Sequence, residues 1–188
     1  MAALVLAGSS CKDRPPPPEL GRVPAFTLRD QQGTRVTEHT VSKGAWALAF
    51  IFTRCPTVCP RVTRAMKQLQ ADAGDRGVEL RLVSVSVDPE HDSPEVLREY
   101  AARFHANTST WRFLTGDPSV VQELADGVKI ALEGAANESA EHFGITHGSH
   151  LVLIDGKGTI RGYYGTSDPL DLQRLLEDAG RIESETSS

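Results

Sequence analysis

Apolar and polar residues alternate along the chain in a pattern that predicts a mixed α/β fold. Residues 45–52 (AWALAFIF) form a continuous apolar run, which is typical of a strand buried on both faces. Apolar and polar residues alternate with period two over 78–87, and 151–154 is a further apolar run; both segments predict strands. Apolar residues recur at helical spacing within 60–73 and 94–104. Periodicity alone therefore favours a three-layer α/β sandwich.

Turn and cap residues refine this picture at several places. Short β-prone segments at 26–28 and 35–37 flank a turn that ends at Gly33, which predicts an N-terminal β-hairpin. Ser93 followed by Pro94 is a typical helix start. A second hairpin is expected around 155–158, and a last amphipathic helix at 169–179.

One domain is expected, covering residues 23–181. Residues 1–22 are interpreted as a leader remnant and a Pro-rich spacer, because a short apolar stretch runs to Gly8-Ser9-Ser10-Cys11 and four prolines follow at 15–18. Cys11 is either a lipid attachment site or an unpaired thiol in a loose tail. Residues 182–188 are expected to form a frayed polar tail.

Composition excludes several classes of protein. The chain has 188 residues and a formal net charge of −5, without runs of Lys or Arg, which argues against a nucleic-acid footprint. No apolar run reaches the roughly 18 residues that span a bilayer. Three cysteines are too few for a disulfide scaffold or for a closed four-cysteine zinc site.

Two of the cysteines lie four residues apart where the first buried strand gives way to a helix. Free backbone N–H groups at a helix N-terminus stabilise a thiolate, and Arg54 adds a nearby positive charge. On one helical turn, Cys55 and Cys59 would share a face, close enough for a disulfide or for one soft metal ion such as Cu(I).

A two-thiolate metal site needs a third ligand, and the position of each histidine decides which is the best candidate. His147 immediately precedes the strand at 151–154, whose entry can lie beside the cysteine loop. His150 is an odd offset away, so in an extended chain it points to the other side. His142 is a weaker candidate, and the remaining histidines are expected to be exposed (His39, His91 and His105).

Three segments together resemble the SCO/SenC family. Residues 53–60 (TRCPTVCP) are similar to its T-x-C-P-x-x-C-P motif, and 86–95 (SVDPEHDSPE) to its S-x-D-P-x-x-D-[TS]-P stretch. His147 matches the family histidine ahead of a strand, and 111–116 (WRFLTG) also fits. The resemblance spans about residues 26–176. It implies a thioredoxin-like three-layer sandwich with an N-terminal β-hairpin.

The resemblance also implies a function, since these proteins bind copper and help to assemble the copper site of cytochrome c oxidase. Carried over, the copper ligands are Cys55, Cys59 and His147, with Cu(I) as cargo and Cu(II) left open. The implied partners are the copper-bearing oxidase subunit, a copper donor and a thiol reductant. Asp88 and Asp92 are interpreted as structural: Asp88 ends a strand, and either Asp92 or Ser93 caps the next helix.

The implied location is the bacterial cell envelope, in the periplasm or on the outer face of the inner membrane. Family members are usually tethered by an N-terminal transmembrane helix, and no complete one is found here. The anchoring of this chain is therefore left open, with a membrane tether through the N-terminus and lipid attachment at Cys11 as the alternatives.

Three functions remain open for the same residues. The leading one is a copper chaperone, which needs no bond-making catalysis. The second is a thiol–disulfide oxidoreductase in which Cys55 attacks a target disulfide and Cys59 resolves it. The third is a redox or copper sensor. A peroxidase is disfavoured because neither cysteine follows a Thr at the peroxiredoxin spacing, and His147 in place of the cis-proline of thioredoxins favours metal binding.

Overall fold

A single curled sheet forms the centre of the molecule. The computed structural model describes residues 15–132 and 149–186. Within these residues the strand order is β1-β8-β7-β4-β5-β6-β2-β3. The strands are β1 (Gly21–Arg22), β2 (Thr27–Asp30), β3 (Arg35–Thr37), β4 (Ala45–Ile51), β5 (Leu80–Ser86), β6 (Trp111–Thr115), β7 (His150–Ile154) and β8 (Thr159–Gly165).

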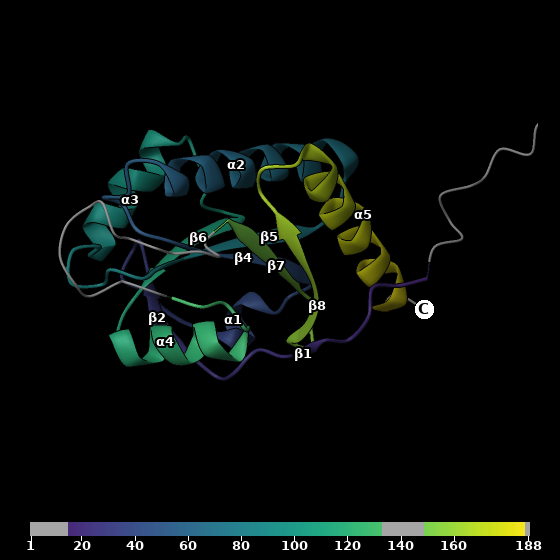
Figure 1. Ribbon diagram of the computed structural model, residues 1–188, viewed down its shortest axis with the longest axis horizontal. Coiled ribbons are helices and arrows are strands. Elements are labelled where there is room, and N and C mark those ends of the chain that lie inside the picture. Colours follow the sequence, from purple (N-terminus) through teal and green to yellow (C-terminus); the bar gives the residue numbers. More distant parts are fainter. Residues whose placement is uncertain (1–14, 133–148, 187–188) are drawn as a thin grey trace, which may run out of the picture.

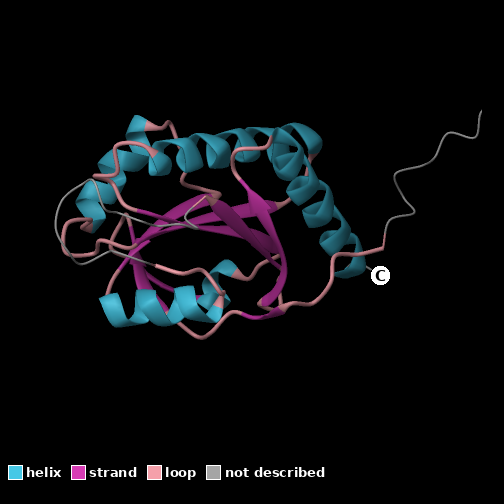
Figure 2. Cartoon of the chain, viewed as in Figure 1, coloured by secondary structure: helices cyan, strands magenta, loops and turns pink. Residues whose placement is uncertain are grey.

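Helices cover both faces of this sheet, which makes three layers. Figures 1 and 2 show α2, α3 and α5 on one face and α1 and α4 on the other. This arrangement confirms the predicted three-layer α/β sandwich. The helices are α1 (Glu38–Val41), α2 (Val58–Arg76), α3 (Pro94–Arg103), α4 (Pro118–Gly127) and α5 (Pro169–Thr186).

The central strand β4 is buried along its whole length. It pairs in parallel with β5 on one side and antiparallel with β7 on the other. All seven of its residues are buried, as the continuous apolar run predicts for a strand with helices on both faces. Because β4, β5 and β6 are parallel, their carboxyl ends meet at one edge of the sheet, where open α/β folds place their functional groups.

Helix α2 lies against this sheet through one apolar stripe. Met66 and Leu69 are fully buried in the core, together with Val62 and Ala73. The helix ends at Gly77, whose φ of 66° is left-handed and suits glycine, and whose N–H closes onto the carbonyl of Ala73. The helix start at α3 is also confirmed.

The predicted N-terminal hairpin is confirmed. Strands β2 and β3 pair antiparallel around a turn in which Gly33 has a φ of 78°, and β2 adds the hairpin to the sheet beside β6. Four elements were not expected from the apolar pattern: β1, α1, β6 and α4.

The last helix runs further than its predicted end at residue 179. Helix α5 continues to Thr186, because Ile182 is 2% exposed in the core and Glu185 forms an ion pair with Arg161. The polar residues after 181 therefore contain the last turn of a docked helix. Among the described helices, none combines the length and the apolarity that a membrane span requires.

Candidate functional site

The two cysteines lie where β4 gives way to α2. The strand ends at Ile51 and α2 begins at Val58, so Cys55 lies in the intervening turn and Cys59 in the first turn of the helix. Sequence reasoning placed both on one helical turn, whereas the structure places only Cys59 within it. Both thiols are free, and the residues are 9% and 3% exposed, respectively.

The two sulfur atoms lie within one network of hydrogen bonds. The backbone N–H of Cys59 donates to Sγ of Cys55 at 3.3 Å, and the N–H of Phe52 donates to Sγ of Cys59 at 3.4 Å. The junction thus brings both sulfurs to the carboxyl end of the central strand. This confirms the predicted proximity of the pair.

The surroundings of the two thiols shift their pKa values in opposite directions. Burial opposes ionisation of Cys55, but the backbone N–H groups of Cys59, Thr57 and Val58 outweigh it and lower its pKa below 9.0. Burial dominates at Cys59 and raises its pKa, and the negative charges of Cys55 and Asp92 add to this effect. The expectation that this junction favours thiolates therefore holds for Cys55 alone.

Asp92 ties the cysteine loop to the neighbouring strand. Its carboxylate is fully buried and accepts hydrogen bonds from the N–H and Oγ1 of Thr53, at 3.0 and 2.5 Å, and from Oγ of Ser86 at 2.5 Å. Ser93 alone caps α3, by accepting from the N–H of Val96. Asp92 and Ser93 were the alternatives for that cap, and Asp92 instead holds Thr53, two positions before Cys55.

A second contact joins the same two loops at the surface. Nη2 and Nε of Arg54 donate to Oδ2 of Asp88, at 2.6 and 3.0 Å. Sequence reasoning expected Arg54 to stabilise a thiolate, whereas hydrogen bonds from Cys59, Thr57 and Val58 lower the pKa of Cys55. Asp88 was expected to end the strand, but β5 ends two residues earlier, at Ser86. Asp88 instead pairs with Arg54 of the cysteine loop.

Tyr100 and Thr63 lie beneath Cys59. Oγ1 of Thr63 donates to the carbonyl of Cys59 at 2.8 Å and lies 2.8 Å from the hydroxyl of Tyr100. Burial raises the pKa of Tyr100 to about 12, so this hydroxyl stays neutral in the physiological range. Tyr100 was expected only as part of the inner face of α3, and Thr63 was not singled out.

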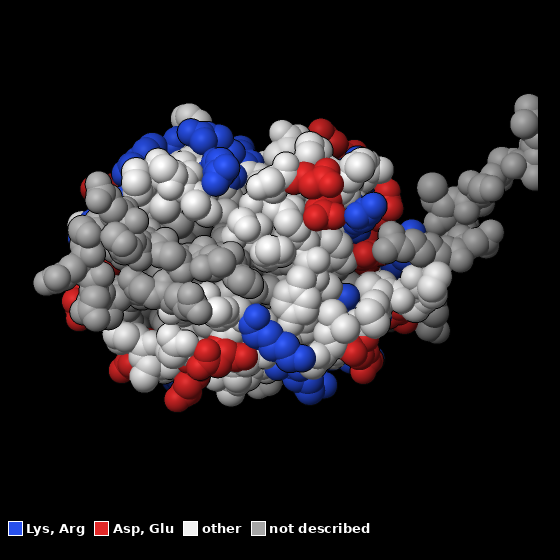
Figure 3. Space-filling model, in the orientation of Figure 1, with Lys and Arg blue, Asp and Glu red and all other residues white. Residues whose placement is uncertain are grey.

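Positive charge gathers near this end of the molecule although the chain is acidic overall. Residues 54–67 include four basic residues and no acidic one: Arg54, Arg61, Arg64 and Lys67. Figure 3 shows Lys and Arg side chains over the N-terminal half of α2 and over α3, and Asp and Glu side chains around α5. This basic surface sets the start of α2 apart from the acidic surface around α5.

The third predicted ligand, His147, lies outside the described residues, as do His142 and Cys11. Among the residues that the structure does describe, no three His, Cys, Asp or Glu side chains converge as metal ligands. The surface positions expected for His39, His91 and His105 are confirmed, and His150 begins β7 in an exposed position. The described half of the site is thus two adjacent thiols, a donor set that suits a soft ion such as Cu(I).

Comparison with known proteins gives this geometry a context. The SCO1/SenC family model matches residues 16–181. A SCO1 protein homolog of Bacillus subtilis is 38% identical over 150 residues, covering 78% of this chain and 75% of its own length. A Stutzerimonas stutzeri protein named as copper-binding is 31% identical over 158 residues, covering 82% of this chain and 74% of its own.

Solved structures agree with the fold. BsSco, described as a member of the Sco family of cytochrome c oxidase assembly proteins with a disulfide switch, superimposes with a TM-score of 0.77 at 28% identity. The superposition covers 89% of this chain and 96% of BsSco. A SCO1/SenC family lipoprotein of Bacillus anthracis gives a TM-score of 0.74 at 27% identity, with 87% of this chain and 95% of its own covered.

Proposed function

Because this chain belongs to the SCO1/SenC family, we propose that it is a copper chaperone that delivers copper to the copper site of cytochrome c oxidase. Cys55, Cys59 and His147 hold the metal as cargo, with Cu(I) as the state best suited to two thiolates and an imidazole. The observation that carries the proposal is the pair of free, adjacent thiols at the carboxyl end of β4. The copper-binding relative supports the choice of metal.

Transfer by ligand exchange requires ligands that the partner can approach. Cys55 lies in the turn before α2 and is the more exposed of the two cysteines, while Cys59 is held deeper by Phe52 and the core. A ligand of the copper-bearing oxidase subunit would therefore meet the metal from the Cys55 side. A copper donor loads the reduced protein, and a thiol reductant keeps the cysteines reduced beforehand.

Anaerobic titration of the fully reduced chain with Cu(I), followed by X-ray absorption, tests the proposal. We expect about one copper per chain, bound by sulfur and nitrogen. His147→Ala should weaken binding and remove the nitrogen, whereas His150→Ala, three residues away, serves as the matched control and should bind like the parent. Unchanged copper affinity and unchanged coordination in His147→Ala would refute the assignment of the third ligand.

A second candidate function is supported by the opposite pKa shifts of the two thiols. As a thiol–disulfide oxidoreductase, the Cys55 thiolate attacks one sulfur of a partner disulfide and releases the other as a thiolate. Cys59 then gives up its proton and attacks Cys55 Sγ, which frees the reduced partner and leaves a Cys55–Cys59 disulfide. An external dithiol must reduce that disulfide before another cycle.

Two single variants separate this candidate from the first. Cys59→Ser should trap a mixed disulfide through Cys55, and Cys55→Ser should not trap one through Cys59. If neither variant forms a mixed disulfide with a disulfide-containing oxidase peptide, while the parent chain still binds Cu(I), the chaperone function stands alone.

The cell envelope is the proposed location, in the periplasm or on the outer face of the inner membrane. The sequence before Cys11 and the lipoprotein relative from Bacillus anthracis support attachment through a lipid on Cys11. Mass spectrometry of the membrane fraction tests this, because Cys11→Ala would lose the lipid mass and move the chain to the soluble fraction.

A further inference from the structure

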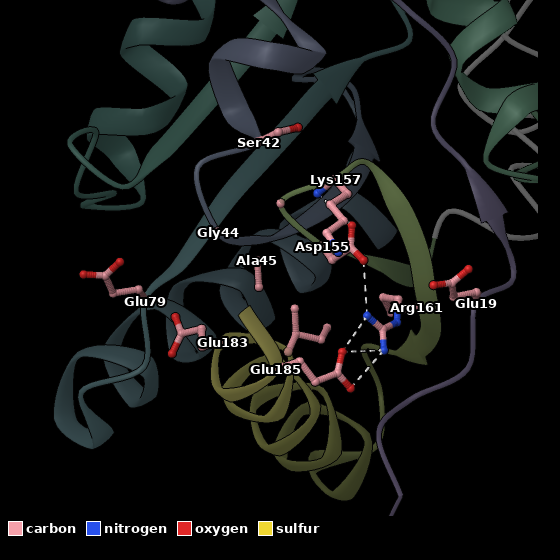
Figure 4. Close-up of a pocket in the computed structure, with 12 residues that line it drawn as sticks. Glu19, Ser42, Gly44, Ala45, Glu79, Asp155, Lys157, Arg161, Glu183 and Glu185 are labelled. Carbon is pink, nitrogen blue, oxygen red and sulfur yellow. Dashed lines mark hydrogen bonds and ion pairs between the residues drawn. The ribbon is translucent and has the colours of Figure 1, made fainter. Parts of the chain in front are cut away.

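A buried arginine holds the proline-rich segment against the domain. The side chain of Arg161 in β8 is 7% exposed, and its Nε and Nη2 donate to the backbone carbonyl of Pro17 at 3.0 and 2.7 Å. Nη1 donates to Oδ2 of Asp155 at 3.2 Å, and both Nη atoms reach the carboxylate of Glu185 at 3.1–3.3 Å. Figure 4 shows the guanidinium between these two carboxylates.

The carbonyl of Pro17 completes a partner set that the guanidinium needs. A buried guanidinium is costly unless its N–H groups are matched by acceptors, and the two carboxylates face only part of the fork. Polyproline II makes no internal hydrogen bonds, so its carbonyls are available to a donor of this kind. Pro17 is buried while its three proline neighbours are exposed. This is the pattern of a segment docked along one side.

The contact with the domain continues past the prolines. The N–H of Leu20 donates to the carbonyl of Ile160 at 2.8 Å, and the N–H of Val23 donates to that of Gly158 at 2.9 Å. The prolines also line a hollow of about 330 Å³ together with Tyr164 and Asp178. Residues 15–23 therefore follow β8 as one docked strand-like segment.

The docked segment lies at the end of the sheet remote from the cysteines. Arg161 contacts Asp155, which directly follows β7, and the last residue of β7 pairs with Trp46 near the start of β4. From Trp46 to the end of β4 at Ile51, the strand rises about 17 Å, and Cys55 lies beyond that end. Figure 1 likewise shows the start of the described chain beside the C-terminal end of α5, away from the N-terminus of α2.

We infer that residues 15–18 are a docked strap, that Arg161 is its anchoring residue, and that the strap turns the cysteine end of the domain away from whatever holds the N-terminus. Cys11 is only four residues from Pro15, a reach of at most about 14 Å, so an attachment there leaves the domain little freedom to turn over. The orientation depends on the proposed anchoring at Cys11, whereas the docking itself does not.

Amide hydrogen exchange of the full-length chain tests the docking. Arg161→Met should raise the exchange rates of the Leu20 and Val23 amides at least tenfold and leave the exchange rates of the β4 amides unchanged. Arg112→Met is the control, because it breaks an ion pair with Asp30 at another part of the sheet. In this control, Leu20 and Val23 should stay protected. If Arg161→Met unfolds, replacing prolines 15–18 with Gly and Ser keeps Arg161 and should give the same local increase. Protection of Leu20 and Val23 that survives both Arg161→Met and the proline replacement overturns the strap.

A vesicle experiment tests the orientation with the anchor imposed chemically. In a Cys55→Ser, Cys59→Ser chain, Cys11 is the one remaining thiol of the sequence and can be coupled to a maleimide lipid in phosphatidylcholine vesicles. A fluorescent side chain at Lys157 should be quenched by nitroxide lipids severalfold more than one at Thr57, and the proline replacement should equalise the two. Equal quenching in the unreplaced strap overturns the orientation. Neither readout involves copper, so failure of the copper proposal would leave both intact.

Discussion

Replacing Asp92 with alanine is expected to destabilise the protein by about 3–4 kcal/mol. The carboxylate is fully buried and accepts three hydrogen bonds, each of the kind worth about 1.5–3 kcal/mol when one partner is charged. The sum is not additive, because the hydroxyls of Thr53 and Ser86 can turn to other acceptors while the N–H of Thr53 cannot. Asp92→Asn keeps the shape and part of the bonding, so about 1–2 kcal/mol is expected there.

Urea unfolding followed by circular dichroism measures these losses. With a slope of about 2 kcal/mol per molar urea, Asp92→Ala should lower the midpoint by about 1.5–2 M. Asp126→Ala is the matched control, since that carboxylate is exposed on α4 and accepts one hydrogen bond from Gln122, and it should shift stability by less than about 0.5 kcal/mol.

A double-mutant cycle with Thr53→Val shows whether the network acts as described. If Asp92 stabilises the cysteine loop through Thr53, the two substitutions should be non-additive by at least about 0.5 kcal/mol. A loss below about 1 kcal/mol for Asp92→Ala, or strictly additive effects, would refute the reasoning.

Three further predictions follow from the same structure. Iodoacetamide should modify Cys55 at least tenfold faster than Cys59 below pH 9. The lowered pKa of Cys55 makes its thiolate available at lower pH, whereas the pKa of Cys59 is raised. Equal modification rates of the two cysteines in peptide mass spectra would contradict this assignment. Cu(I) at a hundred times its dissociation constant should stabilise the reduced protein by about 2.7 kcal/mol, measured as a higher melting temperature, and should not stabilise the Cys55→Ser, Cys59→Ser chain. Ser93→Ala should cost about 1 kcal/mol in urea unfolding and Ser93→Asp much less, since Asp also caps a helix.

Local patterns could predict the elements that carry the cysteines. The apolar run of β4 is long enough to identify a doubly buried strand, and the apolar spacing in α2 identifies its buried face without knowledge of the rest of the fold. The same logic could have found α4, where Asp117 caps the helix and Pro118 opens it. Arg112 interrupts the apolar residues of β6, and α1 is a single turn, so neither carries enough periodicity to be recognised.

Contacts between distant residues could not be predicted in this way. Nothing near Asp92 indicates that its carboxylate will reach Thr53, 39 positions earlier, instead of capping the adjacent helix. Arg161 and Pro17 are 144 positions apart, and the sequence alone shows only a proline run and an arginine in a strand. Such pairs are set by how the sheet folds back on itself. His147 as third ligand stays a prediction.

The unequal thiols also have a consequence for how metal loading depends on acidity. Each sulfur must lose its proton before it can bind copper. Between the two pKa values, Cys55 is already ionised and Cys59 is not, so binding one Cu(I) expels a single proton, which comes from the deeper sulfur. In that pH interval, and with any imidazole ligand neutral, each decrease of one pH unit should lower the affinity for Cu(I) about tenfold. A local drop in pH at the delivery site would then favour release.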